Sequence, residues 1–255
     1  MKNNFHVIIP ARMHSTRLPH KMTLDIAGVP LIVRTAQQAL KSNAVQVVVA
    51  TDHEEIAKVC TKYKIKNILT SVEHHNGTDR IKEAVELLDL DKEGIVINVQ
   101  GDEPLIAPEL INQLADFAHK EHAEVATIAH PIENEDEIFA SSVVKVVLDK
   151  WSNAMYFSRA PIPFYRDGFP PNYEFSLPPS INILRHIGIY AYRVKFIITY
   201  NQLQISPIEW VEGLEQLRAL YNGHKIAVFV TDTLPASGVD TLADLQRVRQ
   251  LLGHN

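Results

Sequence analysis

The chain has 255 residues, of which 46% are hydrophobic and 22% are charged, and its formal net charge is −5. This is the composition of a globular protein, and its acidic balance disfavours a protein that grips nucleic acid through the phosphates. A single cysteine, Cys60, excludes an intrachain disulfide framework and a multi-cysteine metal site. We therefore expect a protein of the reducing cytoplasm, without a secretory signal and without insertion into a membrane.

In the first half of the chain, short β-branched runs alternate with segments of helical spacing. This rhythm indicates βαβ units on a parallel sheet, and the nearly continuous apolar strands fit a sheet covered on both faces. The predicted strands are residues 5–10, 45–51, 65–70, 94–100 and 124–130, and the predicted helices are residues 30–42, 53–63, 77–90 and 107–120.

The loops after these strands are expected to carry the function. Right-handed crossovers bring such loops to one edge of a parallel sheet, and ligands bind at the carboxyl ends of its strands. The loops begin at Ala11, Thr51, Thr70, Gln100 and Pro131.

The second half of the chain departs from this rhythm. We interpret residues 1–255 as a single α/β domain, in which a mostly parallel central sheet is flanked by helices. An insertion at about residues 140–200, with apolar and aromatic side chains, is expected to form a dimer surface. The predicted elements are strands at 143–149, 186–192 and 226–232, a long loop at about 161–180, a helix at 206–223 capped by Ser206 and ended by Gly223, and a closing helix at 241–252.

The sequence VIIPARMHSTRLPHK, residues 7–21, joins an apolar strand to a segment with three Arg and Lys residues and no carboxylate. Arg12, Arg17 and Lys21 can converge there, and guanidinium and ammonium groups bind phosphate oxygens. A cationic loop that opens a helix suits a diphosphate or a triphosphate, although the spacing is not that of the Walker P-loop. The alternative interpretation is a solvated surface loop.

Carboxylates appear at two other places, one after a predicted strand and one before a predicted helix. In NVQGDEP, Asp102 and Glu103 follow a buried strand and precede Pro104, and Asp240 precedes the last predicted helix. A carboxylate in such a place can hold Mg²⁺ beside a phosphate. The alternatives are a Gly-Asp turn for the first pair and a helix N-cap for Asp240. Two aspartates that meet the cations of the first loop would form a phosphoryl- or nucleotidyl-transfer site.

A further polar group is found in FSRAPIP, LRHIGIY and GLEQLR. The alternative interpretation of His186 is a buried core histidine whose ring nitrogens have hydrogen-bond partners. Arg80 follows Gly77 near the start of a predicted helix, and the doublet His74 and His75 is interpreted as a loop because adjacent residues seldom share one metal ion. The residues of this group are Arg159, His186, Tyr190, Glu215 and Gln216.

Taken together, these stretches resemble the 3-deoxy-manno-octulosonate cytidylyltransferase family. The resemblance covers nearly the whole chain and includes VATDHEEIA, HHNGTDRI, VINVQGDEP, YFSRAPIP, LRHIGIYAYR, SPIEWVEGLEQLRALYNG and GVDTLADLQRVR besides the first loop. The combination is specific, whereas the first loop is shared by sugar-nucleotide transferases generally. The resemblance implies a single Rossmann-like nucleotidyltransferase domain, with an inserted region for dimerisation and sugar binding.

Members of this family couple the acidic sugar 3-deoxy-D-manno-octulosonate (Kdo) to CTP. They release pyrophosphate and form CMP-Kdo for the inner core of lipopolysaccharide. The resemblance therefore implies a cytoplasmic homodimer that uses CTP, Kdo and Mg²⁺. It further implies that Arg12, Lys21 and Asp102 are catalytic and that Asp102 and Asp240 hold the metal.

Two more sets of residues are carried over by motif. The first set would bind CTP, with Arg17 as a further phosphate candidate, and comprises Ala11, Arg12, Lys21, Ser71 and Gly77. The second set would line the sugar pocket and comprises Arg80, Gln100, Arg159, His186, Tyr190, Glu215 and Gln216.

The chain departs from the family at residue 20, where RLPHK has a histidine in place of the usual glycine. If this position requires a positive φ, His20 is strained, though less than a β-branched residue would be. Three alternatives stay open. They are the same chemistry on 8-amino-Kdo or another acidic sugar, a cytidylyltransferase for a polyol phosphate, and a non-catalytic nucleotide-binding module.

Overall fold

The structure of the chain, a computed structural model, describes residues 4–15, 17–74, 76–166, 168–169, 182–233, 236 and 238–253. His75 and most of the predicted loop at about 161–180 lie outside these residues. Within the described part of the chain, no helix is long and apolar enough to cross a membrane.

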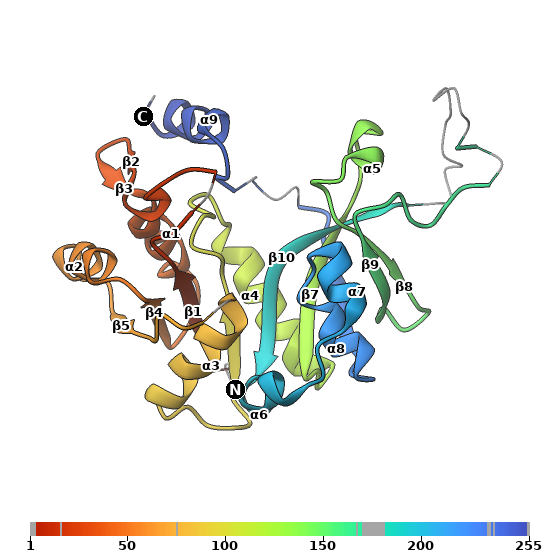
Figure 1. Cartoon of the computed structure of the whole chain (residues 1–255), viewed down its shortest axis with the longest axis horizontal. Helices are drawn as coiled ribbons and strands as arrows, with labels where there is room; N and C mark the ends of the chain where they lie inside the picture. Colours follow the sequence, from red (N-terminus) through yellow and green to blue (C-terminus); the bar gives the residue numbers. More distant parts are fainter. Residues whose placement is uncertain are drawn as a thin grey trace.

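A nine-stranded sheet forms the centre of the described residues (Figure 1). Along its main path the strands follow the order β11-β7-β10-β6-β1-β4-β5, while β8 pairs with β10 and with β9. The strands are β1 (Phe5–Ala11), β4 (Gln46–Thr51), β5 (Asn67–Leu69), β6 (Ile95–Asn98), β7 (Val125–Pro131), β8 (Lys145–Leu148), β9 (Ala154–Ser158), β10 (Leu184–Arg193) and β11 (Ile226–Val230).

The prediction of a mostly parallel sheet is confirmed. β4 and β6 run parallel to β1 on its two sides, β5 runs parallel to β4, and β11 runs parallel to β7. The exception is β10, which lies antiparallel between β6 and β7 and also pairs with β8 of the β8–β9 hairpin. The strand predicted at residues 186–192 is therefore a long central strand, and the hairpin extends from one end of it.

Helices cover both faces of the sheet (Figure 1). Side chains alternate along a strand, so Val7 and Ile9 of β1 pack in one buried cluster with α1 and α4, and Ile8 packs in a second cluster with α3 and α6. Burial on both faces explains the continuous apolar runs of the sequence. The helices are α1 (Leu31–Ala39), α2 (Glu54–Lys62), α3 (Gly77–Leu87), α4 (Pro108–Lys120), α5 (Asp136–Phe139), α6 (Val194–Thr199), α7 (Pro207–Glu212), α8 (Leu217–Tyr221) and α9 (Leu242–Gly253).

Smaller elements complete the fold. A 3₁₀ turn, η1 (Lys21–Thr23), ends the first loop, and the short pair β2 (Asp25–Ile26) and β3 (Val29–Pro30) follows it. A second 3₁₀ turn, η2 (Tyr200–Gln202), follows α6. The last helix, α9, packs against β2, so the end of the chain returns to the first loop.

The helix predicted at residues 206–223 is two helices in the structure. The Ser206 hydroxyl caps α7 by accepting from the N–H of Ile208 at 3.2 Å, as predicted. Gly213 then ends α7 with a φ of 63°, because a left-handed glycine cannot continue a helix. Glu215 and Gln216 consequently lie in the turn between α7 and α8.

The loops after β1 and β6 leave the sheet side by side. The two strands are parallel neighbours, with Ile8 opposite Asn98. A Cβ atom at Gly101 would stand 3.0 Å from the carbonyl oxygen of Pro10, so glycine allows this approach without a shift of the neighbouring backbone. The first loop and the NVQGDEP loop therefore share one edge of the sheet, as the parallel arrangement predicted.

Candidate functional site

The candidate site lies where these two loops meet the segment that precedes α9. Lys21 of η1 is 7% exposed. Its ammonium donates to Asp102 Oδ2 at 2.5 Å and to Asp240 Oδ1 at 3.0 Å. Burial lowers the pKa of Lys21, but the two carboxylates outweigh burial and raise its pKa overall. The site thus holds one positive charge between two negative ones.

A backbone contact holds Asp240 beside Asp102. The N–H of Val239, which is fully buried, donates to the carbonyl oxygen of Asp102 at 2.9 Å. At Gly238 a Cβ atom would stand 3.2 Å from that carbonyl and 2.9 Å from Glu103 Oε1. The glycine therefore favours the close approach of the last segment to the end of β6, although the two segments are far apart in the sequence.

Asp240 does not cap α9, so that alternative interpretation is wrong. The cap is Thr241, whose hydroxyl accepts from the N–H of Asp244 at 3.2 Å, while Asp244 Oδ2 accepts from the N–H of Thr241 at 2.9 Å. This reciprocal pair is a capping box. Asp240 instead binds Lys21 and pairs with Arg17 Nη2 at 3.3 Å, so its carboxylate contacts two cationic side chains.

His20, which stands where the family has glycine, adopts the left-handed conformation with a φ of 54°. Its carbonyl oxygen accepts from the N–H of Thr23 at 3.0 Å, which starts η1. The residue thus adopts a positive φ in this chain, and histidine tolerates that conformation better than a β-branched residue does. The loop reaches the geometry that orients Lys21 without a glycine.

The residues present suit a divalent cation. Asp102 and Asp240 each direct one oxygen to a single point, where the Lys21 ammonium now lies. Burial, and then the charges of Asp102 and Asp240, raise the pKa of Glu103 to about 8. No group of three or more His, Cys, Asp or Glu ligands converges within the described residues. Mg²⁺ commonly uses one or two carboxylates and takes its other ligands from phosphate and water, so the pair is sufficient.

Two adjoining cavities open at this edge of the sheet. The first, which we call the outer cavity, has a volume of about 950 Å³. It contains the cations of the first loop and both aspartates, a charge pattern that suits a polyphosphate with a metal ion. The predicted site residues that line it are Ala11, Arg12, Lys21, Gly77, Arg80, Gln100, Asp102, His186, Glu215 and Asp240, together with Arg17.

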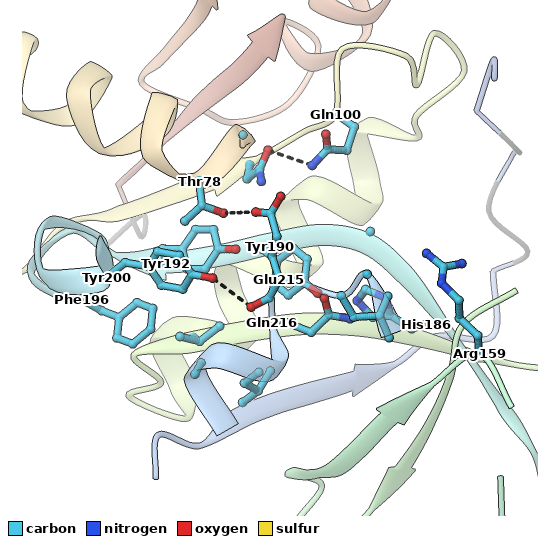
Figure 2. Close-up of a pocket in the computed structure, with 18 of the residues that line it drawn as sticks. Thr78, Gln100, Arg159, His186, Tyr190, Tyr192, Phe196, Tyr200, Glu215 and Gln216 are labelled. Carbon is cyan, nitrogen blue, oxygen red and sulfur yellow. Dashed lines mark hydrogen bonds between the residues drawn. The ribbon is translucent and has the colours of Figure 1, made fainter. Parts of the chain in front are cut away.

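The second, which we call the inner cavity, has a volume of about 500 Å³ and is shown in Figure 2. It is bordered by β10, by the start of α3 and by the turn between α7 and α8, and its walls are polar and aromatic. Arg17, Gly77, Gln100, His186, Gly188 and Glu215 line both cavities, so ligands in the two would touch. The predicted sugar residues that line it are Gln100, Arg159, His186, Tyr190, Glu215 and Gln216.

The surroundings of His186 favour a neutral imidazole. Burial lowers its pKa to about 3. Its Nε2 lies 2.9 Å from the hydroxyl of Thr127, whose single hydrogen can be donated to the carbonyl oxygen of Ile189 at 2.8 Å. With the Thr127 hydrogen donated in this way, Nε2 would carry the imidazole proton and donate it to Thr127, and Nδ1 would be left as an acceptor for a ligand hydroxyl.

Glu215 lies in the middle of the inner cavity, with Tyr192 on one side and His186 on the other (Figure 2). The hydroxyl of Thr78 donates to Glu215 Oε2 at 2.9 Å, and that of Tyr200 donates to the Glu215 carbonyl at 2.9 Å. Burial raises the pKa of the Glu215 carboxyl. The buried hydroxyl of Tyr190 has no hydrogen-bond partner among the described residues. These groups offer donors and acceptors to a polyhydroxylated ligand.

The geometry does not support two of the predicted site residues, Ser71 in the CTP set and Arg80 in the sugar set. Ser71 lines neither cavity, and its N–H donates to Glu83 Oε2 at 2.8 Å. Arg80 borders the outer cavity but is only 3% exposed, because its guanidinium donates to Asp52 Oδ2 at 2.8 Å and to Thr70 Oγ1 at 2.5 Å. Arg80 thus fixes the loop after β5, and its geometry does not support the prediction that it contacts the sugar.

Several residues of the site were missed in the sequence. Tyr192 lines the inner cavity, and Arg185 Nη1 pairs with Glu137 Oε2 at 3.0 Å on the wall of the outer cavity. Lys145 of β8 and Glu212 of α7 hold Arg159 in place through hydrogen bonds. A lysine inside the apolar run VVKVVL was the one available signal, since a strand interior rarely holds an unpaired cation.

Comparison with known proteins agrees with this geometry. The family model described as Cytidylyltransferase matches residues 6–226. The chain is 51% identical to a 3-deoxy-manno-octulosonate cytidylyltransferase of Neisseria meningitidis serogroup C, over 96% of both chains. It is 50% identical to that of Herminiimonas arsenicoxydans, over 97% of this chain and 98% of the other.

A solved structure has the same fold. It is described as CMP:2-keto-3-deoxy-manno-octonic acid synthetase complexed with CTP. The TM-score is 0.88, the sequence identity is 37%, and the alignment covers 98% of both chains. The similarity therefore extends over the sheet, the hairpin and both cavities.

Proposed function

Because this chain belongs to the 3-deoxy-manno-octulosonate cytidylyltransferases, within the wider cytidylyltransferase family, we propose that it transfers CMP from CTP to Kdo. The products are pyrophosphate and CMP-Kdo, the activated donor for the inner core of lipopolysaccharide. The main support is the Lys21 ammonium held between Asp102 and Asp240 where a cationic cavity adjoins a polar, aromatic one. Charges for a triphosphate and room for a sugar acid lie next to each other.

We assign the triphosphate of CTP to the outer cavity. Arg12, Arg17 and Lys21 line it and supply the positive charge, and Ala11 and Gly77 border it at the end of β1 and the start of α3. The cytosine would lie between the first loop and the loop after β5. The solved relative whose description includes CTP supports a CTP site in this fold.

In the proposed reaction, the anomeric 2-hydroxyl of Kdo attacks the α-phosphorus of CTP. A bond forms between that oxygen and phosphorus, the bond to the β-phosphate oxygen breaks, and pyrophosphate leaves. In-line attack inverts the configuration at phosphorus. Lys21 and Arg12 stabilise the charge that develops on the α-phosphate and on the leaving pyrophosphate. The hydroxyl proton passes to solvent, and no protein nucleophile is required.

Asp102 and Asp240 are proposed to hold Mg²⁺. When bound, the metal would neutralise phosphate charge and lower the pKa of the attacking hydroxyl. Both carboxylates accept from Lys21 in this structure, so the ammonium offsets part of their negative charge.

The sugar acid is assigned to the inner cavity. Arg159 is proposed to pair with its carboxylate, because guanidinium groups bind carboxylates well, and Arg80 is already paired with Asp52. Nδ1 of His186 would accept from a sugar hydroxyl, and Glu215 and Gln216 would bind the others. The position of the carboxylate next to the outer cavity would bring the anomeric hydroxyl toward CTP.

We further infer a homodimer in which the β8–β9 hairpin and α7 form the contact. Trp151 and Met155 of the hairpin are 70% and 63% exposed, and Trp210 and Val211 of α7 are 84% and 74% exposed. The hydroxyl of Ser158 joins the hairpin to α7 by donating to Glu212 Oε1 at 2.6 Å. Apolar surface of this extent is typical of an interface. The buried, free thiol of Cys60 suits a reducing cytoplasm.

The test is pyrophosphate release from purified protein with CTP and Mg²⁺. Kdo, 8-amino-Kdo and N-acetylneuraminate are supplied in parallel. We expect release with Kdo well above that with the other two. Release only with the 8-amino sugar would keep the chemistry but move the specificity, and the wall around Arg159, His186 and Glu215 would then have to recognise an ammonium. Binding of CTP without release from any sugar would leave a non-catalytic nucleotide-binding module.

A further inference from the structure

Lys145, the first residue of β8, has a completely buried ammonium group. It donates to the carbonyl oxygens of Ala140 at 3.0 Å, Val143 at 2.7 Å and Arg159 at 2.6 Å. A lysine ammonium has three donors, so these contacts satisfy all of them. Within the described residues, no carboxylate forms an ion pair with it.

Packing alone does not explain a buried lysine at this position. A buried charge without an opposite charge in contact is costly. Burial accordingly lowers the pKa of Lys145, and only the more distant charge of Glu212 opposes this shift. An apolar side chain at this position would not carry that cost. The lysine therefore requires another explanation, and its three contacts supply one.

Lys145 and Arg159 bind the same turn of the backbone, and Lys145 also binds the backbone of Arg159. The backbone N–H of Arg159 donates to Glu212 Oε2 at 2.9 Å, and Nε donates to the carbonyl oxygen of Glu212 at 2.7 Å. Nη1 donates to the carbonyl oxygen of Ser141 at 2.9 Å. Ser141 lies in the same turn as Ala140 and Val143, whose carbonyls Lys145 binds, so Lys145 fixes both the backbone of Arg159 and the turn that holds its guanidinium.

The contacts to described residues use Nε and Nη1 and leave Nη2 of Arg159 as the donor that can reach a ligand. Figure 2 shows Arg159 at the end of the inner cavity, beyond His186. A guanidinium is planar, so two fixed nitrogens determine where the third one points. The direction of Nη2 is thus set by the turn at residues 140–143 and by the end of α7.

We propose that Lys145 is a positioning residue for sugar recognition: it binds the two backbone segments that aim Arg159 into the inner cavity. The proposal rests on the proposed function, in which Arg159 pairs with the carboxylate of the sugar acid. Lys145 itself touches no substrate. Its loss should therefore weaken the use of the sugar and leave the use of CTP unchanged.

The test is a double-mutant cycle of Lys145→Met and Arg159→Ala, measured by pyrophosphate release. Methionine keeps the unbranched stem and removes the three donors. Lys145→Met should raise the KM for Kdo about tenfold and change the KM for CTP less than about twofold. The double variant should resemble Arg159→Ala alone, because Lys145 acts through Arg159.

Lys150→Met is the matched control. Lys150 lies in the turn of the same hairpin, where its ammonium is 4.3 Å from the centre of the exposed Trp151 ring, and its loss should leave both KM values unchanged. If Lys145→Met does not fold, as judged by circular dichroism, Glu212→Gln replaces it. That variant alters the carboxylate that receives the N–H of Arg159, and it should show the same sugar-specific loss.

Equal rises in the KM for Kdo and for CTP would overturn the proposal, since a general loss of structure affects both substrates. The proposal would also be overturned if the rise in the KM for Kdo in the double variant equalled the product of the rises in the two single variants. These results differ from a failure of the proposed function. If the wild-type protein turns over no sugar, the reaction and this assignment both fall, whereas a wild type that uses Kdo leaves only the role of Lys145 at issue.

Discussion

At the scale of single residues, the candidate site is organised by one ammonium group and two carboxylates that contact one another. Lys21 is the first residue of a 3₁₀ turn, Asp102 follows β6 and Asp240 precedes α9, yet the ammonium of the lysine lies within hydrogen-bond distance of both carboxylates. Such a cluster is stable only while the opposite charges balance. Binding of a metal ion and a triphosphate would add charges of both signs, and the cluster can exchange partners without being rebuilt.

Replacement of Asp102 tests this arrangement. Asp102→Asn keeps the shape of the side chain and removes one metal ligand, so kcat should fall at least about 100-fold at saturating Mg²⁺. The free energy of unfolding should change by less than about 1 kcal/mol, because the side chain is partly exposed. Steady-state kinetics and urea unfolding measure the two effects. Glu121→Gln, at the exposed end of α4, is the control, and near-normal turnover of Asp102→Asn would refute the metal assignment.

His186 makes a different prediction, which concerns acid stability. Its pKa is about 3 in the folded protein, because of burial, and about 6.5 in an unfolded chain. The unfolded chain therefore binds a proton between these values that the folded protein does not. The contribution of the neutral His186 to the free energy of unfolding is fully present above about pH 6.5 and is lost as the pH falls toward 3.

His186→Gln should reduce that dependence on pH. The slope of the free energy of unfolding between pH 6 and pH 4 should fall by at most about 1.4 kcal/mol per pH unit, which corresponds to one proton. Urea unfolding at a series of pH values measures this slope, and equal m-values show that the same transition is compared. An unchanged slope would mean that the imidazole is already charged in the folded protein.

At the scale of elements, the break between α7 and α8 supplies two residues of the inner cavity. Gly213 adopts a φ of 63°, and the turn that follows brings Glu215 and Gln216 to the wall. A continuous helix through this segment would direct the two side chains differently, since helical neighbours point about 100° apart. A single left-handed glycine thus determines part of the sugar pocket.

Gly213→Ala should therefore affect both stability and the sugar. A left-handed alanine is less stable by about 1 kcal/mol, and there is open space around the added methyl group, so strain is the only cause. Displacement of the turn should raise the KM for Kdo several-fold and spare that for CTP. Gly223→Ala is the control, since Gly223 has a φ of 83° and ends α8 away from both cavities. It should lose similar stability with unchanged kinetics, and equal kinetic effects of the two variants would contradict the role of the turn.

At the scale of the whole molecule, the antiparallel β10 joins the two halves of the chain. It pairs with β7 along most of its length, with β6 at its end and with β8 at its start. The hairpin and α7 are thereby attached to one side of the nucleotide-binding sheet. The same side carries the exposed apolar residues of the proposed dimer contact.

Sedimentation velocity tests the dimer. We expect the wild-type chain to sediment as two copies at micromolar concentration, because apolar side chains such as Met155 and Trp210 would otherwise face water. Met155→Glu should shift the protein toward the monomer, since burial of a charge without a partner is unfavourable. Leu40→Glu, at an exposed leucine after α1, should remain dimeric. A wild-type monomer would exclude the proposed contact.

The sequence by itself determined the class of fold and the family, and most of the site residues it predicted line one of the two cavities. Strand and helix periods are local, and the parallel rhythm places successive loops at one edge, so Arg12, Lys21 and Asp102 could be grouped before their contacts were known. The local departure at His20 raised the question of a positive φ there, and the structure shows that the residue adopts one. These features depend on neighbours in the chain.

Only the tertiary structure decided the contacts between distant segments. That Asp240 binds Lys21 and does not cap α9, that Arg80 is committed to Asp52, and that a buried Lys145 aims Arg159 all depend on how separate elements pack. Hydrogen bonds between residues far apart in the chain leave no periodic pattern in the sequence. Their partners are chosen by burial and distance, because a polar group inside the protein must find its partner wherever the fold brings one.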